Sequence, residues 1–147
     1  MPMKKQTSIR NTAMNLLARR EHSASELLQK LKQRDHDADE ILLVIEQLQA
    51  DNLQSDARFA ESFINQRANS GRGPVKIRHE LRQKGVAEDL TESLLEPFAE
   101  QWQAHMIEQR IRKFGRDIPA DYAQKMKQAR FLQNRGFSPE SVMRLFR

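Results

Sequence analysis

The sequence predicts an all-α protein made of three tandem three-helix units that together form an elongated body. Apolar residues recur at helical spacing throughout, and no stretch alternates apolar and polar residues as a half-buried strand does. The chain also repeats itself, because Leu31, Leu81 and Leu132 occupy equivalent places in one layout, 50 and 51 residues apart. Repeats of this length are typical of stacked helical units that bury their faces against their neighbours. We place the units at residues 1–52, 53–101 and 102–147.

The first unit is expected to contain three helices joined by short turns. The first helix spans roughly residues 6–20, as its apolar spacing indicates. Ser23 is placed as the N-cap of the second helix, with Glu26 at the matching position of a capping box. Asp35 or Asp37 then starts the third helix.

The second unit is divided by a glycine-rich break that is followed by proline. Its first helix ends at residues 70–73, and Pro74 stands where a new helix begins, because proline is tolerated in the first turn of a helix. Gly85 is placed to cap the end of that helix. We expect the interior of this unit to be built on Phe59, Phe63, Ile77, Leu81, Leu90 and Leu94.

The third unit carries the densest positive charge of the chain. Its first helix begins at Trp102 and breaks at Gly115, and a second helix resumes near Tyr122. Phe114 and Phe131 are interleaved with the cations and are expected to pack in the core, while stacking on single-stranded bases is the alternative. The cations are Arg110, Arg112, Lys113, Arg116, Lys125, Lys127, Arg130 and Arg135.

The composition excludes several classes of function. The chain has 147 residues, of which 31% are charged and 38% hydrophobic, and this favours several thin helical cores over one large core. The absence of cysteine excludes a disulfide framework, thiol catalysis and cysteine zinc sites. No apolar run approaches the length of a membrane span, and the N-terminus lacks the apolar core of a signal peptide. We therefore expect a cytoplasmic protein without membrane contact.

The sign of the charge alternates along the chain, although the net charge is only +5. Residues 35–66 carry one cation and eight anions, whereas residues 67–84 carry six cations and one anion. Residues 85–102 then carry no cation and five anions, and residues 103–147 carry ten cations and four anions. Helix dipoles explain acids near helix N-termini. They do not explain acids such as Glu46, so part of the pattern is left for a function to explain.

The sequence offers no catalytic or metal-binding constellation. Asp35, Asp37, Asp39 and Glu46 match positions of a calcium-binding loop, but Glu40 stands where that loop needs glycine, and an apolar helix follows. The four histidines are far apart in the chain and are expected to be exposed. The lone Gly-x-Gly lacks the strand and the third glycine of a nucleotide-binding loop. We expect no enzyme activity, no cofactor and no metal.

The basic segment around the glycine-rich break is the strongest candidate for a contact surface. A solvated helix face is the ordinary meaning of any single such cation, but unpaired basic patches commonly face acidic protein surface or phosphate. An ordinary loop between helices needs no rigid Gly-x-Gly-Pro turn. We also expect Lys76 and Glu80 to pair along one helix face. The predicted partner-binding residues are Arg67, Arg72, Lys76, Arg78, Arg82, Lys113, Arg116 and Arg130.

The stretch from Asp56 to Gly85 resembles the signature of the RecX family, bacterial proteins that bind and restrain the recombinase RecA. That signature has an acid before an Arg-Phe pair, then a Gly-x-Gly-Pro break and a tail that ends in Lys-Gly. The matching residues here are Asp56, Arg58, Phe59, Arg67, Gly71, Gly73, Pro74, Lys76, Ile77, Glu80, Leu81, Lys84 and Gly85. Fainter similarity extends over residues 9–146. One departure is the run at residues 52–56, which lacks the family's usual aromatic residue.

The RecX resemblance implies a three-unit helical fold and a non-enzymatic regulator of DNA repair and recombination. Such a protein binds the RecA filament and limits its recombinase, ATPase and coprotease activities. We further expect a monomer, with weak contact to single-stranded DNA at most. The residues alone leave an alternative open, a nucleic-acid-binding helical module without sequence preference, although the acidic blocks would repel phosphate.

Overall fold

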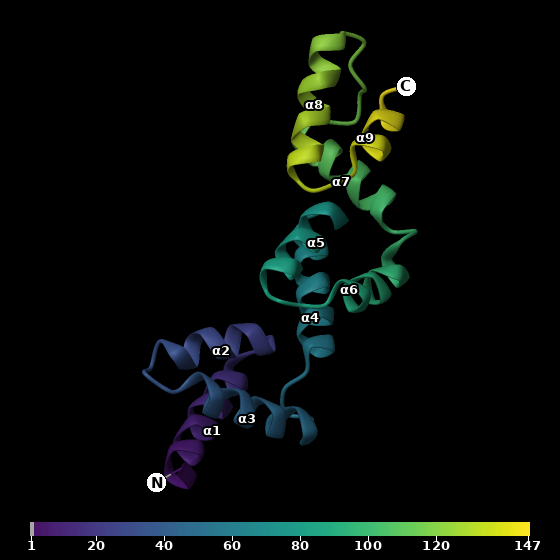
Figure 1. The fold of residues 1–147 in the computed structure, drawn as a ribbon. Helices are drawn as coiled ribbons and strands as arrows, with labels where there is room; N and C mark the ends of the chain where they lie inside the picture. The colour runs from purple at the N-terminus through teal and green to yellow at the C-terminus, as the bar shows by residue number, and fades with distance from the viewer. Residues whose placement is uncertain (1) are drawn as a thin grey trace.

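The computed structural model describes residues 2–147, with side chains from Thr7 onward, and this part of the chain is helical without strands. The elements follow one another along the molecule (Figure 1). They are α1 (Pro2–Arg19), α2 (Ala24–Lys32), α3 (Ala38–Ala50), α4 (Asp56–Asn69), α5 (Pro74–Gln83), α6 (Glu88–Leu95), the short 3₁₀ helix η1 (Glu96–Phe98), α7 (Trp102–Phe114), α8 (Tyr122–Asn134) and α9 (Pro139–Leu145). The predicted all-α fold is confirmed.

The helices pack in three successive groups, which we call the first unit (α1–α3), the second unit (α4–α6) and the third unit (α7–α9) (Figure 1). Each unit has its own apolar core. Leu31, Leu81 and Leu132 are completely buried, one in each core, so the predicted repeat is confirmed. Within residues 2–147, no helix combines the length and the apolar character that crossing a membrane requires.

The helix boundaries follow local signals in the sequence. The Ser23 hydroxyl accepts the backbone N–H of Glu26 at 3.1 Å, and the Glu26 carboxylate accepts that of Ser23 at 3.1 Å, so the predicted capping box is present. Asp37 caps α3 through its carboxylate, which accepts two backbone N–H groups. Pro74 occupies the first turn of α5.

The core of the second unit contains the four central residues predicted from the sequence. Phe59, Phe63, Ile77 and Leu81 are buried. The two predicted residues on α6, Leu90 and Leu94, are half-buried and pack at the edge of this cluster. Four further residues are buried in this core, which are Ala60 and Ile64 on the apolar face of α4, and Val86 and Leu95.

His22 contradicts the prediction that the histidines are exposed, because it is 1% exposed. Its Nε2 lies 3.0 Å from the Lys30 ammonium, which can only donate, so Nε2 accepts and the ring proton is on Nδ1. Nδ1 then donates to the carbonyl of Arg20 at 3.0 Å. The His22 carbonyl accepts from the Gln54 amide at 3.1 Å. His22 is buried because it lies where the first unit meets the segment leading into the second.

Neighbouring units meet in one recurring way: the N-terminus of the middle helix of one unit touches the last turn of the middle helix of the next. In the contact that we call the first joint, the Ser23 hydroxyl donates to the carbonyl of Lys84 at 2.7 Å. In the second joint, the backbone N–H of Gly73 donates to the carbonyl of Arg135 at 2.8 Å. The backbone N–H of Val75 donates to the carbonyl of Gly136 at 2.9 Å. The repeat thus extends to the way its units are connected.

Candidate partner interface at the second joint

The Gly-x-Gly-Pro turn owes its composition to the second joint. A Cβ atom on Gly73 would lie 2.5 Å from the carbonyl carbon of Gly136, and a Cβ atom on Gly136 would overlap with that of Lys76. A Cβ atom on Gly71 would overlap with the side chain of Gln109 on α7. The predicted partner surface was argued in part from the rigidity of this turn. Contact with the third unit accounts for the glycines within the chain itself, so the rigidity no longer supports a partner surface, and the prediction rests on the cations alone.

A basic groove lies beside this joint, between the end of α4 and the helices α7 and α8. Its volume is about 330 Å³. The residues that line it are Asn69, Ser70, Gln109, Arg112, Lys113, Phe131 and Arg135. The second and third units both contribute to it, so the groove exists only when the joint is formed.

An aromatic ring beneath two cations forms one wall of the groove. The Phe131 ring lies 5.2 Å from the Arg135 guanidinium and 5.8 Å from the Lys113 ammonium, within the range of cation–π contacts. Phe114 meets the same ring edge-on, with centroids 5.3 Å apart. Both phenylalanines are half-buried. Phe131 packs against the core of the third unit as predicted, whereas Phe114 contacts the Phe131 ring and is not a member of that core cluster.

Two cations of the glycine-rich turn extend this basic surface. The Arg72 guanidinium donates to the carbonyl of Ser70, a groove residue, at 3.3 Å. Lys76 is exposed, and its Cβ lies against Gly136. Among the described residues, no carboxylate forms an ion pair with Arg72, Lys76, Lys113 or Arg135, and we call these four residues the joint cations. Unpaired positive charge of this kind is available to an anionic partner.

The remaining predicted contact residues do not gather at this surface. Arg67 pairs with Glu80 at 2.9 Å and lies 4.6 Å from the Phe63 ring centroid. Arg78 pairs with Glu92 at 2.6 Å. The predicted pairing of Lys76 with Glu80 is therefore wrong, because Arg67 reaches that carboxylate across the turn between α4 and α5.

Three further predicted residues are exposed at other places. Arg82 lies on the outer face of α5, where it lines a small depression with Arg78. Arg116 follows α7 in the loop that leads to α8, and Arg130 lies on α8. The structure thus places three of the eight predicted residues, Arg72, Lys76 and Lys113, around the second joint.

Arg135 is a joint cation that the predicted set did not include. Its position in the repeat was a usable signal, because Arg34, Lys84 and Arg135 all stand just before the residue that ends the middle helix. The carbonyl groups of Lys84 and Arg135 are the acceptors of the two joints. Lys84 and Arg135 therefore lie beside unit boundaries, whereas Arg34 is exposed in the first unit.

Arg110, which the sequence counts among the cations of the third unit, lies inside it. Its side chain is 3% exposed and donates to the carbonyls of Arg116 and Asp117 at 2.8 and 3.3 Å and to the Gln128 amide oxygen at 3.3 Å. Its Nε is buried without an acceptor among the described residues. Arg110 therefore ties the loop after α7 to α8 and is not part of the basic surface. Within residues 2–147, no group of three or more histidine and carboxylate side chains is placed to hold a metal ion.

The architecture defines a protein of tandem three-helix repeats with a basic surface at a unit joint, and comparison with known proteins identifies the family. Models of the first, second and third three-helix domains of RecX match residues 10–48, 55–95 and 99–146. The chain belongs to the RecX family.

Relatives agree with this assignment over nearly the whole chain. The regulatory protein RecX of Halorhodospira halophila (strain DSM 244 / SL1) is 44% identical over 92% of this chain and 84% of its own. That of Pseudomonas fluorescens (strain SBW25) is 42% identical over 94% of this chain and 89% of its own. The crystal structure of RecX from Lactobacillus salivarius shares the fold, with a TM-score of 0.80 at 22% identity over 98% of this chain and 97% of that one.

Proposed function

We propose that this chain binds the RecA filament and restrains its recombinase, ATPase and coprotease activities, without catalysing a reaction itself. The observation that carries the proposal is the match to all three RecX domains, together with relatives named regulatory proteins at 44% and 42% identity. The resemblance of residues 56–85 to the RecX signature implies RecA as the partner. In this proposal the chain acts as a monomer in the cytoplasm, where the RecA filament forms.

The arrangement of the units suits a filament as the partner. The three units follow one another along the molecule (Figure 1), and the charge of the chain alternates in blocks. A helical filament presents the same protein surface repeatedly, so several units can engage neighbouring protomers at once. Modest contacts then add up, because each contact raises the effective concentration of the next.

The joint cations are the part of the surface that we propose to meet acidic groups of the filament. They are unpaired, whereas Arg67 and Arg78 are already neutralised within the chain. Complementary charge of this kind raises the association rate and, where the pairs are desolvated, also slows dissociation. Arg82, Arg116 and Arg130 remain predicted contact residues, although they lie outside this surface.

The test is inhibition of RecA-driven strand exchange and of DNA-dependent ATP hydrolysis by equal concentrations of wild type and the double variant Arg72→Glu/Lys76→Glu. Lys76 is exposed, and Arg72 is half-buried and donates to a carbonyl rather than to a carboxylate, so the double variant should fold normally. It should inhibit about tenfold less well. The matched control is Lys32→Glu/Arg34→Glu, which makes the same charge change at two exposed positions of the first unit. Equal inhibition by wild type and the joint variant would place the contact surface elsewhere.

A second candidate function is weak binding of single-stranded nucleic acid in the basic groove. The observation that favours it is the Phe131 ring beside unpaired Lys113 and Arg135, since aromatic rings and cations together bind bases and phosphates. Such binding should be salt-sensitive and indifferent to sequence. Anisotropy titrations with labelled oligonucleotides at two salt concentrations would test it, and tight binding to one preferred sequence would favour this function over RecA regulation.

A further inference from the structure

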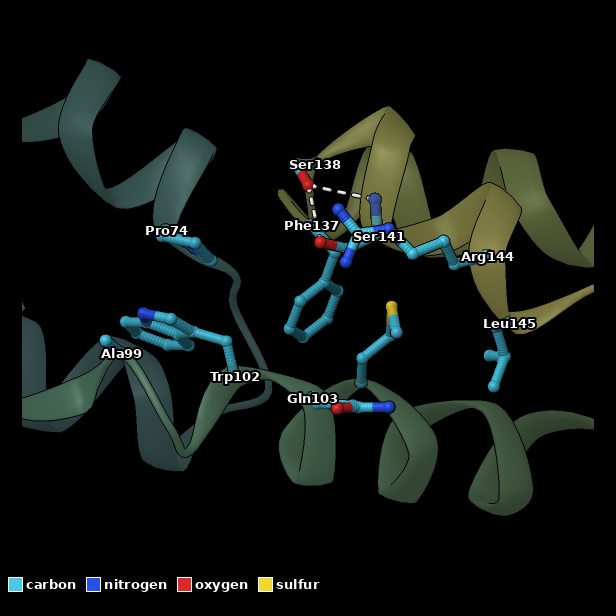
Figure 2. A pocket seen from close by; sticks show the side chains of 10 residues that line it. Pro74, Ala99, Trp102, Gln103, Phe137, Ser138, Ser141, Arg144 and Leu145 are labelled. Carbon is cyan, nitrogen blue, oxygen red and sulfur yellow. Dashed lines mark hydrogen bonds between the residues drawn. The ribbon is translucent and has the colours of Figure 1, made fainter.

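A second cavity opens beside the second joint, along the first half of α7, and shares no lining residue with the basic groove. Its volume is about 440 Å³. Three parts of the chain line it (Figure 2). The start of α5 contributes Pro74. Helix α7 and the segment before it contribute Ala99, Trp102, Gln103 and Met106. The turn before α9 and α9 itself contribute Phe137, Ser138, Ser141, Arg144 and Leu145. We call it the Trp102 pocket.

Apolar side chains form one part of the wall of the Trp102 pocket, and their neighbours hold them in place. Met106 and Phe137 are each 2% exposed and form part of the core of the third unit. The Trp102 ring stacks on Phe98 with centroids 5.7 Å apart, and His105 meets it edge-on at 5.9 Å. A half-buried indole fixed on two sides presents a preformed apolar surface, which lowers the entropic cost of binding.

Two polar side chains that line the pocket, those of Gln103 and Arg144, are exposed and available to a ligand. The hydroxyls of Ser138 and Ser141 bond to each other at 2.8 Å, and the Ser138 hydroxyl also accepts the backbone N–H of Ser141 (Figure 2). Of the described residues that line the pocket, Arg144 alone is charged. It pairs with Glu140 at 2.7 Å, but these two side chains are 62% and 78% exposed, so the pair contributes little and most guanidinium N–H groups stay free.

We propose that the Trp102 pocket is an anchor site that takes one large apolar side chain from an acidic segment of a partner protein, with a neighbouring carboxylate on Arg144. This inference rests on the proposed function and names the segment of the partner that meets the third unit. Charge complementarity supports an acidic partner, because residues 103–147 carry ten cations and four anions and no acid lines the pocket.

The residue types of the pocket also match those that dominate binding energy at protein interfaces. Tryptophan and arginine in desolvated pockets, surrounded by weaker contacts, are typical of such sites. The pocket also lies next to the joint cations, because Pro74, which lines the pocket, follows closely after Arg72 in the same turn. A partner segment that crosses the joint would thus touch charged and apolar features in succession.

The experiment measures binding of this chain to RecA filaments assembled on single-stranded DNA with a non-hydrolysable ATP analogue. The chain has no cysteine, so one cysteine introduced at exposed Asn11 carries a unique fluorescent label for anisotropy. Ala99→Trp fills the mouth of the pocket from an exposed position, and Arg144→Gln removes its charge. The matched controls are Ala104→Trp, at an exposed position of α7 outside the pocket, and Arg19→Gln on exposed α1 surface.

Each pocket variant should weaken binding about tenfold or more, as loss of an interface anchor does, while both controls stay within about twofold of wild type. Circular dichroism should be identical for all five proteins. If wild type binds filaments and the pocket variants bind equally well, the anchor site is overturned and the proposed function stands. If wild type itself fails to bind, the proposed function falls, and the anchor site with it.

Discussion

The two joints have the same position in the repeat but are built from different chemistry. The first joint consists of side chains: the Ser23 hydroxyl donates to the Lys84 carbonyl, and Glu26 pairs with Arg20 and Lys84 at 3.1 and 3.3 Å. The backbone N–H of Ala24 also donates to a carboxylate of the following unit, that of Asp56, at 2.9 Å. The second joint consists of two backbone hydrogen bonds between chain segments in direct contact.

The difference teaches that one packing geometry can be specified by charge or by the absence of side chains. Glu26 is mostly shielded from solvent, and its two cations and its cap hydrogen bond hold the pKa of this carboxyl at about 2, against the burial that would raise it. The first joint should therefore respond to pH. The second joint has no titratable group in its hydrogen bonds, so it should respond to backbone changes instead.

The largest effect is expected from Gly136→Ala, which attacks the second joint. The glycine has φ +103°, a conformation that costs an L-residue roughly 1–2 kcal/mol. The added Cβ would also overlap with Lys76, so the total loss of unfolding free energy should be about 2–4 kcal/mol. Denaturant unfolding followed by circular dichroism measures this loss.

Two glycine controls separate the causes of that effect. Gly115→Ala imposes only the backbone strain, because its φ is +88° and no atom lies within 4 Å of the added Cβ. Gly73→Ala imposes only the steric overlap with Gly136, since its φ is −93°. If Gly136→Ala costs no more than Gly115→Ala, the close approach at the second joint is not what requires glycine.

An intermediate effect is expected from Glu26→Gln, which attacks the first joint. The amide can still accept the Ser23 N–H but loses charge-assisted bonds to Arg20 and Lys84, so we expect a loss of roughly 1–3 kcal/mol at pH 7. High salt should shrink the difference, because both cations are about half exposed. The loss from Gly136→Ala should be insensitive to salt, and equal salt dependence of the two variants would contradict the comparison.

The pH dependence of the wild type should come from the same carboxyl. The folded pKa of Glu26 lies below that of the unfolded chain, so its contribution is fully present above about pH 4.5 and is lost as pH falls toward 2. The free energy of unfolding of Glu26→Gln should therefore change less with pH over this range than that of wild type. Parallel pH profiles would show that Glu26 does not stabilise the first joint.

A smaller effect is expected from His22 at milder pH. Burial lowers the pKa of His22, and the nearby cations Arg20 and Lys30 lower it further, although the hydrogen bond to the Arg20 carbonyl and the charge of Glu26 oppose them. The unfolded chain then binds a proton that the folded chain refuses, so stability falls as pH drops below about 6.5. His22 can change the free energy of unfolding by at most about 1.4 kcal/mol per pH unit. Denaturant unfolding at several pH values should show this dependence in wild type and not in His22→Gln.

The features of the fold that depend on local signals in the sequence could be predicted. Caps, proline positions and apolar spacing act within a few residues, so the helices, the repeat and the residues Phe59, Phe63, Ile77 and Leu81 could be predicted. The burial of His22 could not, because it depends on how one unit sits on the next.

The candidate site shows the same limit. The basic character of the segment around Gly73 is visible in the sequence, but the docking of Gly73 on Gly136 is a contact between residues far apart in the chain. Arg67 and Arg78 have the same composition signal as Arg72, and only the fold shows that their charges are already paired. Availability for a partner is a property of the arrangement and not of the residue type.

The smallest effect is expected at Asp35, the third copy of the joint turn. It aligns with Gly85 and Gly136 and has φ +63°, yet it is exposed, unlike Gly136, which is buried against α5. Free of the close contact, the position tolerates a side chain at the cost of backbone strain alone. Asp35→Gly should therefore stabilise the protein by about 0.5–1 kcal/mol, the gain of strain relief less the entropy of glycine.

The reciprocal change sharpens this last prediction. Gly85→Asp adds a side chain where a Cβ would lie 2.5 Å from that of Ser25, so it should destabilise by more than strain alone, roughly 2 kcal/mol or above. Ser25 is a side chain that can shift, so the loss should stay below that of Gly136→Asp, whose neighbour is also backbone. Thermal unfolding of the three variants should rank them Asp35→Gly, Gly85→Asp and Gly136→Asp in falling stability. Any other order would show that the three turns are not copies of one joint.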